Sequence, residues 1–488
     1  MILVQIMDDN KTIKSQMVSG SIWVFGANMI SRAISFLATL ILARLLMPEA
    51  FGIIGYGFLI VNAISMIREM GFNSALIYQK NDIEGAASLA LVLIFLWSLF
   101  LYLFVFCLAP IAAHFFREPR LTLLLRILTI SLVMNSLSSI PMALLSREIN
   151  FKKRVIPELL NLTVYGIVTV LFALLGLNYW AFVIGVLAAD IVQLLAALIL
   201  RPVTIHTKPN FKIFKELFGF GKSVIGLNIL NFSIRNIDDF FVGRMLGTVS
   251  LGVYNFSYRI ANIPATNITN VLGKVLFPGF TKIAGDTERL RTGFLRAFKY
   301  ISYLTVPVTF YLILLTPEVI NHFLRHWVSA ILPIQLIAYY GGLRSLGSGT
   351  GSVFFAKGKP HRLLPISLVQ VIFLTLFLYP TIHYFGLTGV CILVNIDMTI
   401  AFVWSIIRLK KLIQMSLTVF FNTLRLPLIV SGVGYALLMY LGDVIKIDWA
   451  YYSLVLKGLG FPLIYLLATY TLSTTPGEMF CDLFKPGE

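Results

Sequence analysis

The feature that most constrains this chain is a succession of apolar stretches, each long enough to cross a bilayer. About 20 apolar residues in an α-helix span the hydrocarbon core. Fourteen stretches meet this length, at about 19–43, 50–68, 87–112, 121–145, 157–176, 179–200, 217–242, 250–276, 296–316, 330–353, 363–384, 386–407, 418–440 and 449–472. Lipid offers no partner to a free backbone N–H or C=O group, so each stretch is predicted to be a helix. The sequence therefore predicts an all-α polytopic membrane protein with about fourteen transmembrane helices.

The composition agrees with this class and argues against a soluble protein. Of the 488 residues, 58% are hydrophobic and 12% are charged, and the mean hydropathy is +0.87. A soluble chain of this length would need far more polar surface. The net charge of +17 raises the question of nucleic acid, but the Lys and Arg residues lie in short segments between apolar stretches. We therefore expect no nucleic-acid partner.

The basic connectors predict the orientation of the chain. Counted from the amino terminus, the even-numbered connectors hold most of the basic residues, in Arg147–Arg154, Arg201–Lys215, Thr281–Arg296, Lys357–Arg362 and Arg408–Lys411. Roughly 23 Lys and Arg residues fall on that side and about 6 on the other, and cytoplasmic connectors carry such an excess. Both termini are therefore predicted to be cytoplasmic. The opposite connectors are too short to hold an external enzyme domain.

An internal repeat divides the chain. Residues 20–62 align without gaps over residues 220–262 and share residues at an offset of 200: Gly26 with Gly226, Asn28 with Asn228, Arg44 with Arg244, Leu46 with Leu246, Gly52 with Gly252 and Asn62 with Asn262. We interpret this as two pseudo-symmetric six-helix lobes of the same orientation; chance identity is the alternative. The predicted domains are an N-terminal lobe (1–200), a cytoplasmic linker (201–216), a C-terminal lobe (217–411), and two further helices with a cytoplasmic tail (412–488).

One predicted helix, Phe218–Leu246, combines spanning length with several polar residues: Asn228, Asn231, Arg235, Asp238 and Asp239. At about 100° per residue, both asparagines, Arg235 and Asp239 share one stripe, with Asp238 at its edge. A charge near the midplane costs roughly 2.5–3.5 kcal/mol on insertion scales, so it normally faces a bundle interior or a wet cavity. This helix is predicted to form the wall of a polar path through the membrane.

The first apolar stretch has a matching pair, Asn28 and Arg32, one helical turn apart. In a two-lobe transporter the equivalent helices would face each other across a central cleft, so this pair is predicted to line a cavity. The alternative is a packing role, in which Arg32 pairs with a buried carboxylate such as Asp190 or Glu69. No carboxylate lies within one turn of Arg32 in sequence, which favours the cavity.

The eighth stretch is among the most polar of all, with candidate ligand-binding residues Tyr254, Tyr258, Arg259, Asn262, Thr266, Asn267, Asn270 and Lys274. Several of them step by three or four residues and so share a broad face. Tyrosine and asparagine suit sugar hydroxyls, whereas arginine and lysine suit phosphate. For the neutral residues the alternative is hydrogen bonding between helices.

Carboxylates within the spans are candidate ion-coupling sites. Asp238 and Asp239 either neutralise Arg235 or take up and release a proton as a cavity opens to each side. Asp397, near Asn395 in the twelfth stretch, is a second candidate site for a proton or another cation such as sodium. The sequence alone leaves both interpretations open.

A glycine- and serine-rich segment, Gly342–Lys359, surrounds Arg344. It lacks the strand and spacing of a nucleotide-binding loop, so close helix packing or a hinge is the favoured interpretation. No zinc-ligand pattern, nucleophile elbow or nucleotide-binding domain is found. We therefore expect no cofactor, no metal and no enzymatic activity. The three cysteines lack metal-type spacing and are interpreted as packing residues.

Four segments resemble the polysaccharide-transporter (Wzx-type flippase) branch of the multidrug/oligosaccharidyl-lipid/polysaccharide exporter superfamily: Ala143–Glu158, Leu251–Pro264, Val275–Ala297 and Gly342–Lys359. The resemblance covers nearly the whole chain. It implies a V-shaped pair of lobes, alternating access, and a bacterial inner-membrane flippase for undecaprenyl-diphosphate-linked oligosaccharide repeat units.

Under this resemblance, the basic residues Arg32, Arg235, Arg259, Lys274 and Arg344 would receive the diphosphate. Amide and tyrosine side chains would bind the sugars. Membrane lipids, a polysaccharide polymerase and the export machinery are the expected partners. An ion-coupled small-molecule or multidrug antiporter of the same superfamily is the alternative, and it predicts an apolar or acidic cavity. A membrane glycosyltransferase or polymerase would need a large external loop or an acidic catalytic motif.

Overall fold

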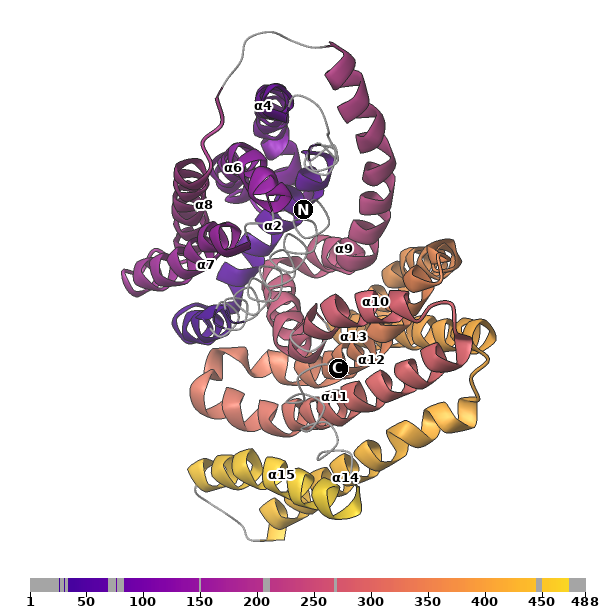
Figure 1. Ribbon diagram of the computed structural model, residues 1–488. Coiled ribbons are helices and arrows are strands. Elements are labelled where there is room, and N and C mark those ends of the chain that lie inside the picture. The colour runs from indigo at the N-terminus through magenta and orange to yellow at the C-terminus, as the bar shows by residue number, and fades with distance from the viewer. Residues whose placement is uncertain are drawn as a thin grey trace. The chain divides into compact units, whose positions relative to one another are not determined.

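The computed structural model describes residues 26, 30, 34–68, 76, 83–148, 151–204, 211–266, 270–444 and 450–473, and every regular element among them is helical (Figure 1). The chain divides into two compact units, Met1–Gly252 and Val253–Glu488. Each unit is described by itself. The predicted lobe and linker boundaries rest on an internal repeat rather than on compactness, and they stay a prediction.

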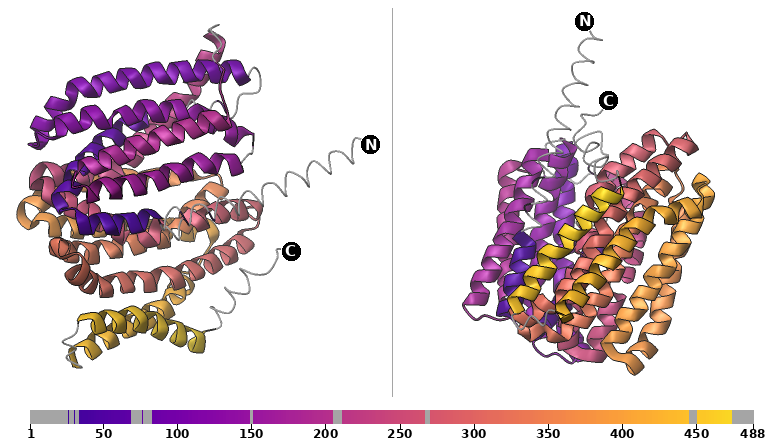
Figure 2. Two further views of the ribbon diagram at one scale, coloured as in Figure 1. Left: turned by 90° about the vertical axis from the view of Figure 1, so that its left-hand side faces the viewer. Right: turned by 90° about the horizontal axis from the view of Figure 1, so that it is seen from below.

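The first unit is a set of helices that lie side by side (Figure 2). Its helices include α2 (Pro48–Arg68), α4 (Ile83–Phe116), α5 (Leu121–Leu128), α6 (Ile130–Arg147), α7 (Phe151–Leu174), α8 (Trp180–Leu200) and α9 (Phe211–Ala261) as far as Gly252. Helix α5 is short and lies in the core, because Leu121, Leu124, Leu125 and Leu128 are all fully buried. Helix α8 packs against both α6 and α7.

The second unit is organised around the long helix α11, which packs against α12, α14 and α15. Its elements are α10 (Asn270–Lys282), α11 (Thr287–Phe323), η2 (Arg325–Ala330), α12 (Ile331–Ala356), η3 (Pro360–Arg362), α13 (Leu364–Ile413), α14 (Leu417–Val444) and α15 (Ala450–Leu472). Phenylalanines form much of its core. The rings of Phe298 on α11 and Phe420 on α14 lie 4.2 Å apart, centroid to centroid.

The predicted class, an all-α polytopic membrane protein, is confirmed. Nine helices in the described part of the chain are long and apolar enough to span a membrane. The count of fourteen is not confirmed. Most of the stretch 19–43 lies outside the described residues, and two helices run through a backbone break and so cover parts of two predicted spans. The breaks are at Gly247 in α9 (φ 82°) and Gly386 in α13 (φ 57°), where glycine adopts a positive φ without strain.

One predicted connector is largely helical. Thr281–Arg296 was expected to link two spans, but α10 ends at Lys282 and α11 begins at Thr287. Asp286 is the N-cap of α11: its Oδ1 accepts the backbone N–H of Glu288 at 2.9 Å and of Arg289 at 3.1 Å. This cap satisfies donors that a helix start leaves unpaired. Hydropathy alone cannot reveal a helix that continues into polar sequence.

Candidate functional site

The candidate site begins where α9 ends, near a proline. Helix α9 stops at Ala261, three residues before Pro264, and helical turns resume at Ile263 after the single turn residue Asn262. Proline lacks a backbone N–H, so it cannot donate to the carbonyl four residues earlier. Asn262 follows the last helical residue and is only 3% exposed. Its Nδ2 donates to the carbonyl oxygen of Tyr258 at 2.9 Å, which fixes the side chain against the end of the helix.

Helix α12 approaches this end of α9 with its backbone. A Cβ atom added to Gly341 would lie 2.2 Å from the carbonyl oxygen of Ala261, so no side chain fits there. Gly342 faces Thr309 of α11 in the same way, at 2.7 Å from its Oγ1. Close helix packing, the interpretation favoured for this glycine-rich segment, is therefore present. It brings the next residues of α12 within reach of α9.

Because α12 packs so closely on α9, Arg344 contacts two residues of α9. Its Nη1 donates to the hydroxyl of Tyr258 and to Oδ1 of Asn262, each at 3.2 Å. The Tyr258 hydroxyl also donates to the hydroxyl of Tyr340 at 3.2 Å. The Tyr254 ring lies 6.2 Å from the Tyr258 ring, centroid to centroid. We call Arg344, Tyr254, Tyr258, Asn262 and Tyr340 the Arg344 cluster.

The charge of Arg344 has no acidic partner in the described part of the chain. Arg344 is half-buried as a residue, and both of its acceptors are neutral. Neutral acceptors leave the positive charge uncompensated, and a guanidinium has five N–H donors, most of which stay available here. Such a group binds phosphate or carboxylate through paired, charge-assisted hydrogen bonds. The cluster is thus suited to an anionic ligand flanked by hydroxyl groups.

Four members of this cluster are candidate residues from the sequence: Tyr254, Tyr258, Asn262 and Arg344. The structure brings them together, although their role in binding stays a prediction. Tyr340 was missed. The available signal was its place four residues before Arg344, which puts both side chains on one face of α12. Arg259, also on α9, is exposed.

The candidates on the earlier part of α9 belong to the first unit. Arg235 is exposed and Asp239 is half-buried. Asp238 is 5% exposed, and its Oδ1 accepts the backbone N–H of Asp239 at 3.0 Å. Neutralisation and ion coupling by these carboxylates both stay predictions. The side chains of Asn228, Asn231 and Lys274 lie outside the described residues, as do Asn28 and Arg32.

Two buried aspartates lie in separate amide environments. Asp397 of α13 is 4% exposed, and its Oδ2 accepts a hydrogen bond from Nε2 of Gln370 at 2.8 Å. Asp190 of α8, considered above as a partner of Arg32, accepts hydrogen bonds from Nδ2 of Asn135 at 2.8 Å and of Asn161 at 3.1 Å. Ion coupling at Asp397 stays a prediction, and Glu69 lies outside the described residues.

An apolar cavity of about 350 Å³ lies between α11 and α15 in the second unit. Its lining is almost entirely hydrocarbon and aromatic, from Tyr303, Leu304, Pro307, Val308, Tyr311, Phe461, Pro462, Tyr465, Leu466 and Thr469. The hydroxyl of Tyr311 donates to the carbonyl of Gly458, and that of Tyr465 to the carbonyl of Tyr303. With these polar groups satisfied, the cavity offers an apolar surface within the membrane-spanning helices.

These features define a helical, multi-pass membrane protein with a cationic, hydroxyl-rich cluster. Residues 41–332 match the family described as "Polysaccharide biosynthesis protein". The chain belongs to this family, as the sequence resemblance predicted.

Named relatives and a solved structure agree with this assignment. The chain is 23% identical over 435 residues to the teichuronic acid biosynthesis protein TuaB of Bacillus subtilis (strain 168), covering 86% of this chain and 88% of TuaB. It is 24% identical over 386 residues to the lipopolysaccharide biosynthesis protein WzxC of Escherichia coli (strain K12), covering 76% and 75%. The fold is similar to the inward closed conformation of the lipid II flippase MurJ, with a TM-score of 0.74 at 17% identity over 96% of this chain and 100% of that one.

Proposed function

We propose that this protein is a flippase that moves undecaprenyl-diphosphate-linked oligosaccharide repeat units across a bacterial inner membrane by alternating access, for polysaccharide export. The observation that carries the proposal is the Arg344 cluster, in which a half-buried arginine has only neutral partners among the described residues. A diphosphate supplies the missing negative charge. The neighbouring tyrosine and asparagine side chains supply hydrogen bonds suited to sugars.

The cargo of such a flippase is amphiphilic, and the second unit offers surfaces for both of its parts. The Arg344 cluster suits the charged headgroup, and the cavity between α11 and α15 suits an isoprenoid chain. The names of TuaB and WzxC place those relatives in the synthesis of teichuronic acid and lipopolysaccharide. Both polymers are made of sugar units, which supports an oligosaccharide cargo here.

The remaining parts of the proposal rest on the sequence. The basic connectors support cytoplasmic termini. Proton or sodium coupling at Asp238, Asp239 or Asp397 is proposed from their burial or polar placement within spans. A polysaccharide polymerase and export machinery are proposed to receive the product. The protein itself is proposed to catalyse no covalent reaction.

The test is binding and export by an Arg344→Gln variant. Farnesyl diphosphate is a suitable probe, because it joins a diphosphate to a short isoprenoid. We expect the purified variant to bind it about 10- to 100-fold more weakly, since a charge-assisted hydrogen bond contributes about 1.5–3 kcal/mol. Surface polysaccharide in cells lacking the native protein should fall in parallel, at unchanged membrane level of the variant.

The matched control is Arg425→Gln, which removes an exposed arginine of α14 outside the cluster. Binding and export should stay at the level of the unmodified protein. Equal binding by the Arg344→Gln variant would refute the assignment of the headgroup site. Transport of organic cations, with no binding of farnesyl diphosphate, would instead support the antiporter alternative.

A further inference from the structure

Two glycines related by the repeat make reciprocal backbone contacts inside the first unit. A Cβ atom added to Gly52 of α2 would lie 1.8 Å from the carbonyl oxygen of Thr248. A Cβ atom added to Gly252 would lie 1.9 Å from the carbonyl oxygen of Pro48. The offset of 200 that aligns the two repeat copies converts Gly52 into Gly252 and position 48 into position 248.

This reciprocity is what a local two-fold axis produces. When residue i of one copy contacts residue j of the other, residue j of the first contacts residue i of the second. The start of α2 and the bend of α9 around Gly247 therefore meet in an isologous contact between the two repeat copies. Any side chain at either glycine would hold the two backbones apart.

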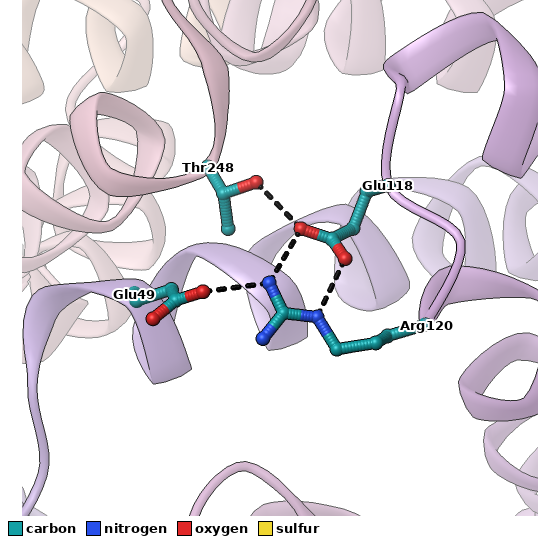
Figure 3. A network of polar contacts seen from close by, with 4 residues as sticks. All are labelled: Glu49, Glu118, Arg120 and Thr248. Atoms are coloured by element: carbon teal, nitrogen blue, oxygen red, sulfur yellow. Dashed lines mark hydrogen bonds and ion pairs between the residues drawn. The ribbon is translucent and has the colours of Figure 1, made fainter.

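A polar network lies beside this contact, formed by Glu49, Glu118, Arg120 and Thr248 (Figure 3). Arg120 donates from Nε to Oε1 of Glu118 at 2.6 Å and from Nη2 to Oε2 of Glu118 at 2.9 Å. The same Nη2 donates to Oε1 of Glu49 at 2.6 Å. The Thr248 hydroxyl donates to Oε2 of Glu118 at 2.9 Å. We call these four residues the polar latch.

The four residues of the polar latch come from both halves of the repeat. Glu49, Glu118 and Arg120 all belong to the predicted N-terminal lobe (1–200), which contains the first copy, and their ion pairs fix the Glu118 carboxylate, which is 5% exposed as a residue. Thr248 belongs to the second copy. The only bond of the polar latch that joins the copies is thus the hydrogen bond from Thr248 to Glu118. The copies can separate here without breaking an ion pair.

An apolar layer continues the contact between the same helices. The hydroxyl of Tyr56, which is fully buried on α2, donates to the carbonyl of Gly243 on α9 at 2.8 Å. The ring of Phe240 on α9 lies 5.8 Å from that of Phe116 at the end of α4. Aromatic rings and a satisfied hydroxyl thus make up most of this layer, and the guanidinium of Arg244 lies over the Phe115 ring at its edge, 5.0 Å from the ring centroid.

We propose that the Gly52–Gly252 contact and the polar latch form a gate, which is closed in this structure and opens when the two repeat copies separate. The gate lies at the connectors predicted to be extracytoplasmic, so opening it would release cargo on that side. This inference rests on the proposed function for its cargo, but not for its geometry. Close glycine contacts seal the gate. The polar latch and the buried Tyr56 join the copies through hydrogen bonds, from Thr248 to Glu118 and from Tyr56 to Gly243, so the gate can reopen without breaking an ion pair.

The first test measures opening directly, with a cysteine at the buried Phe116, whose ring packs against those of Tyr56 and Phe240 and makes no hydrogen bond between the copies. In full-length protein with its native cysteines replaced, Phe116→Cys should react slowly with a membrane-impermeant maleimide applied to intact cells. Adding Gly52→Ala should raise the labelling rate at least 10-fold, because the new methyl group prevents closure. Adding Thr248→Val, which keeps the shape but removes the hydrogen bond, should raise it about 3-fold. Gly432→Ala is the matched control, since a Cβ atom there meets nothing within 4 Å.

The second test locks the gate. A short, reducible bifunctional thiol reagent should join Thr248→Cys to Glu118→Cys across the copies and stop export, and reduction should restore it. The same reagent on Glu49→Cys with Glu118→Cys joins two residues of the first copy, so this crosslink should leave export at the level of the untreated pair.

The possible outcomes test the gate independently of the proposed cargo. Unchanged labelling in both Gly52→Ala and Thr248→Val variants would overturn the gate. Export that continues through a complete crosslink between Glu118→Cys and Thr248→Cys would overturn it as well. Labelling that rises as expected in a protein that transports no lipid-linked oligosaccharide would uphold the gate and refute the proposed function.

Discussion

At the scale of single residues, the informative contrast is between two cations in the helices of the second unit. Lys457 of α15 pairs with Glu318 of α11 at 2.6 Å, and the Ser453 hydroxyl donates to the same carboxylate oxygen. This lysine is fully matched, as a buried charge must be to avoid a large desolvation penalty. Among the described residues, Arg344 contacts only the neutral acceptors Tyr258 and Asn262. An anionic ligand would supply the countercharge that these acceptors do not.

The shape of the Arg344 side chain gives a prediction that is distinct from its charge. In an Arg344→Lys variant, the positive charge is kept but the planar fork of donors is lost. We expect affinity for farnesyl diphosphate to fall by about 3- to 10-fold, which is less than in Arg344→Gln, because only part of the hydrogen bonding is removed. Isothermal titration of the purified proteins measures this order. Equal affinity of the lysine and glutamine variants would contradict a role for charge at this position.

At the scale of helices, the closeness of α9 and α12 determines whether the Arg344 cluster forms. Gly341 allows this approach, because a Cβ atom there would clash with the Ala261 carbonyl oxygen at 2.2 Å. In a Gly341→Ala variant we expect the helices to move apart and Arg344 to lose its contacts with Tyr258 and Asn262. The melting temperature should fall by several degrees, since overpacking costs about 1–3 kcal/mol, and farnesyl diphosphate binding should weaken.

The control for this effect lies on the same helix. A Cβ atom at Gly351 of α12 meets nothing within 4 Å, so Gly351→Ala adds the same methyl group without a clash. Its melting temperature and binding should equal or slightly exceed those of the unmodified protein, because alanine favours a helix more than glycine does. A comparable loss in both variants would show that the closeness of α9 and α12 is not the cause.

Sequence predicted helices better than it predicted the contacts between them. Long apolar stretches must be helical in lipid, so the boundaries of α2 and α14 follow the hydropathy closely. Tyr340 was missed because a tyrosine on an apolar helix face is equally suited to packing. Glu118 and Arg120 were missed because they lie in a connector, where charge is expected. Their importance depends on Glu49 and Thr248, which are distant in sequence and meet only in the fold.

At the scale of the whole molecule, the closed gate is one of two states in a conformational equilibrium. The charges of the polar latch make that equilibrium depend on pH. Burial opposes ionisation of Glu118, but hydrogen bonds from Arg120 and Thr248 and the charge of Arg120 outweigh it and lower the pKa of this carboxyl below its usual value. The pKa of Arg120 is raised, chiefly by its hydrogen bonds to Glu118 and Glu49. Both shifts favour the charged, closed form at neutral pH.

The sign of the pH effect follows from the lowered pKa of Glu118. A carboxyl whose pKa is lowered in the closed state stabilises that state above its usual pKa, and this stabilisation is lost as the pH falls through the lowered value. Maleimides and methanethiosulfonates both need the thiolate, which is scarce in acid. Opening is therefore followed with 4,4′-dithiodipyridine, which protonation activates, on Phe116→Cys, and the rate is normalised to Leu175→Cys at an exposed position in the connector between α7 and α8. The normalised rate should stay constant from pH 7 to about pH 5 and rise below about pH 4. In a Glu118→Gln variant it should start higher and lose this acid-dependent rise, and a rise that persists there would assign the pH dependence to another group.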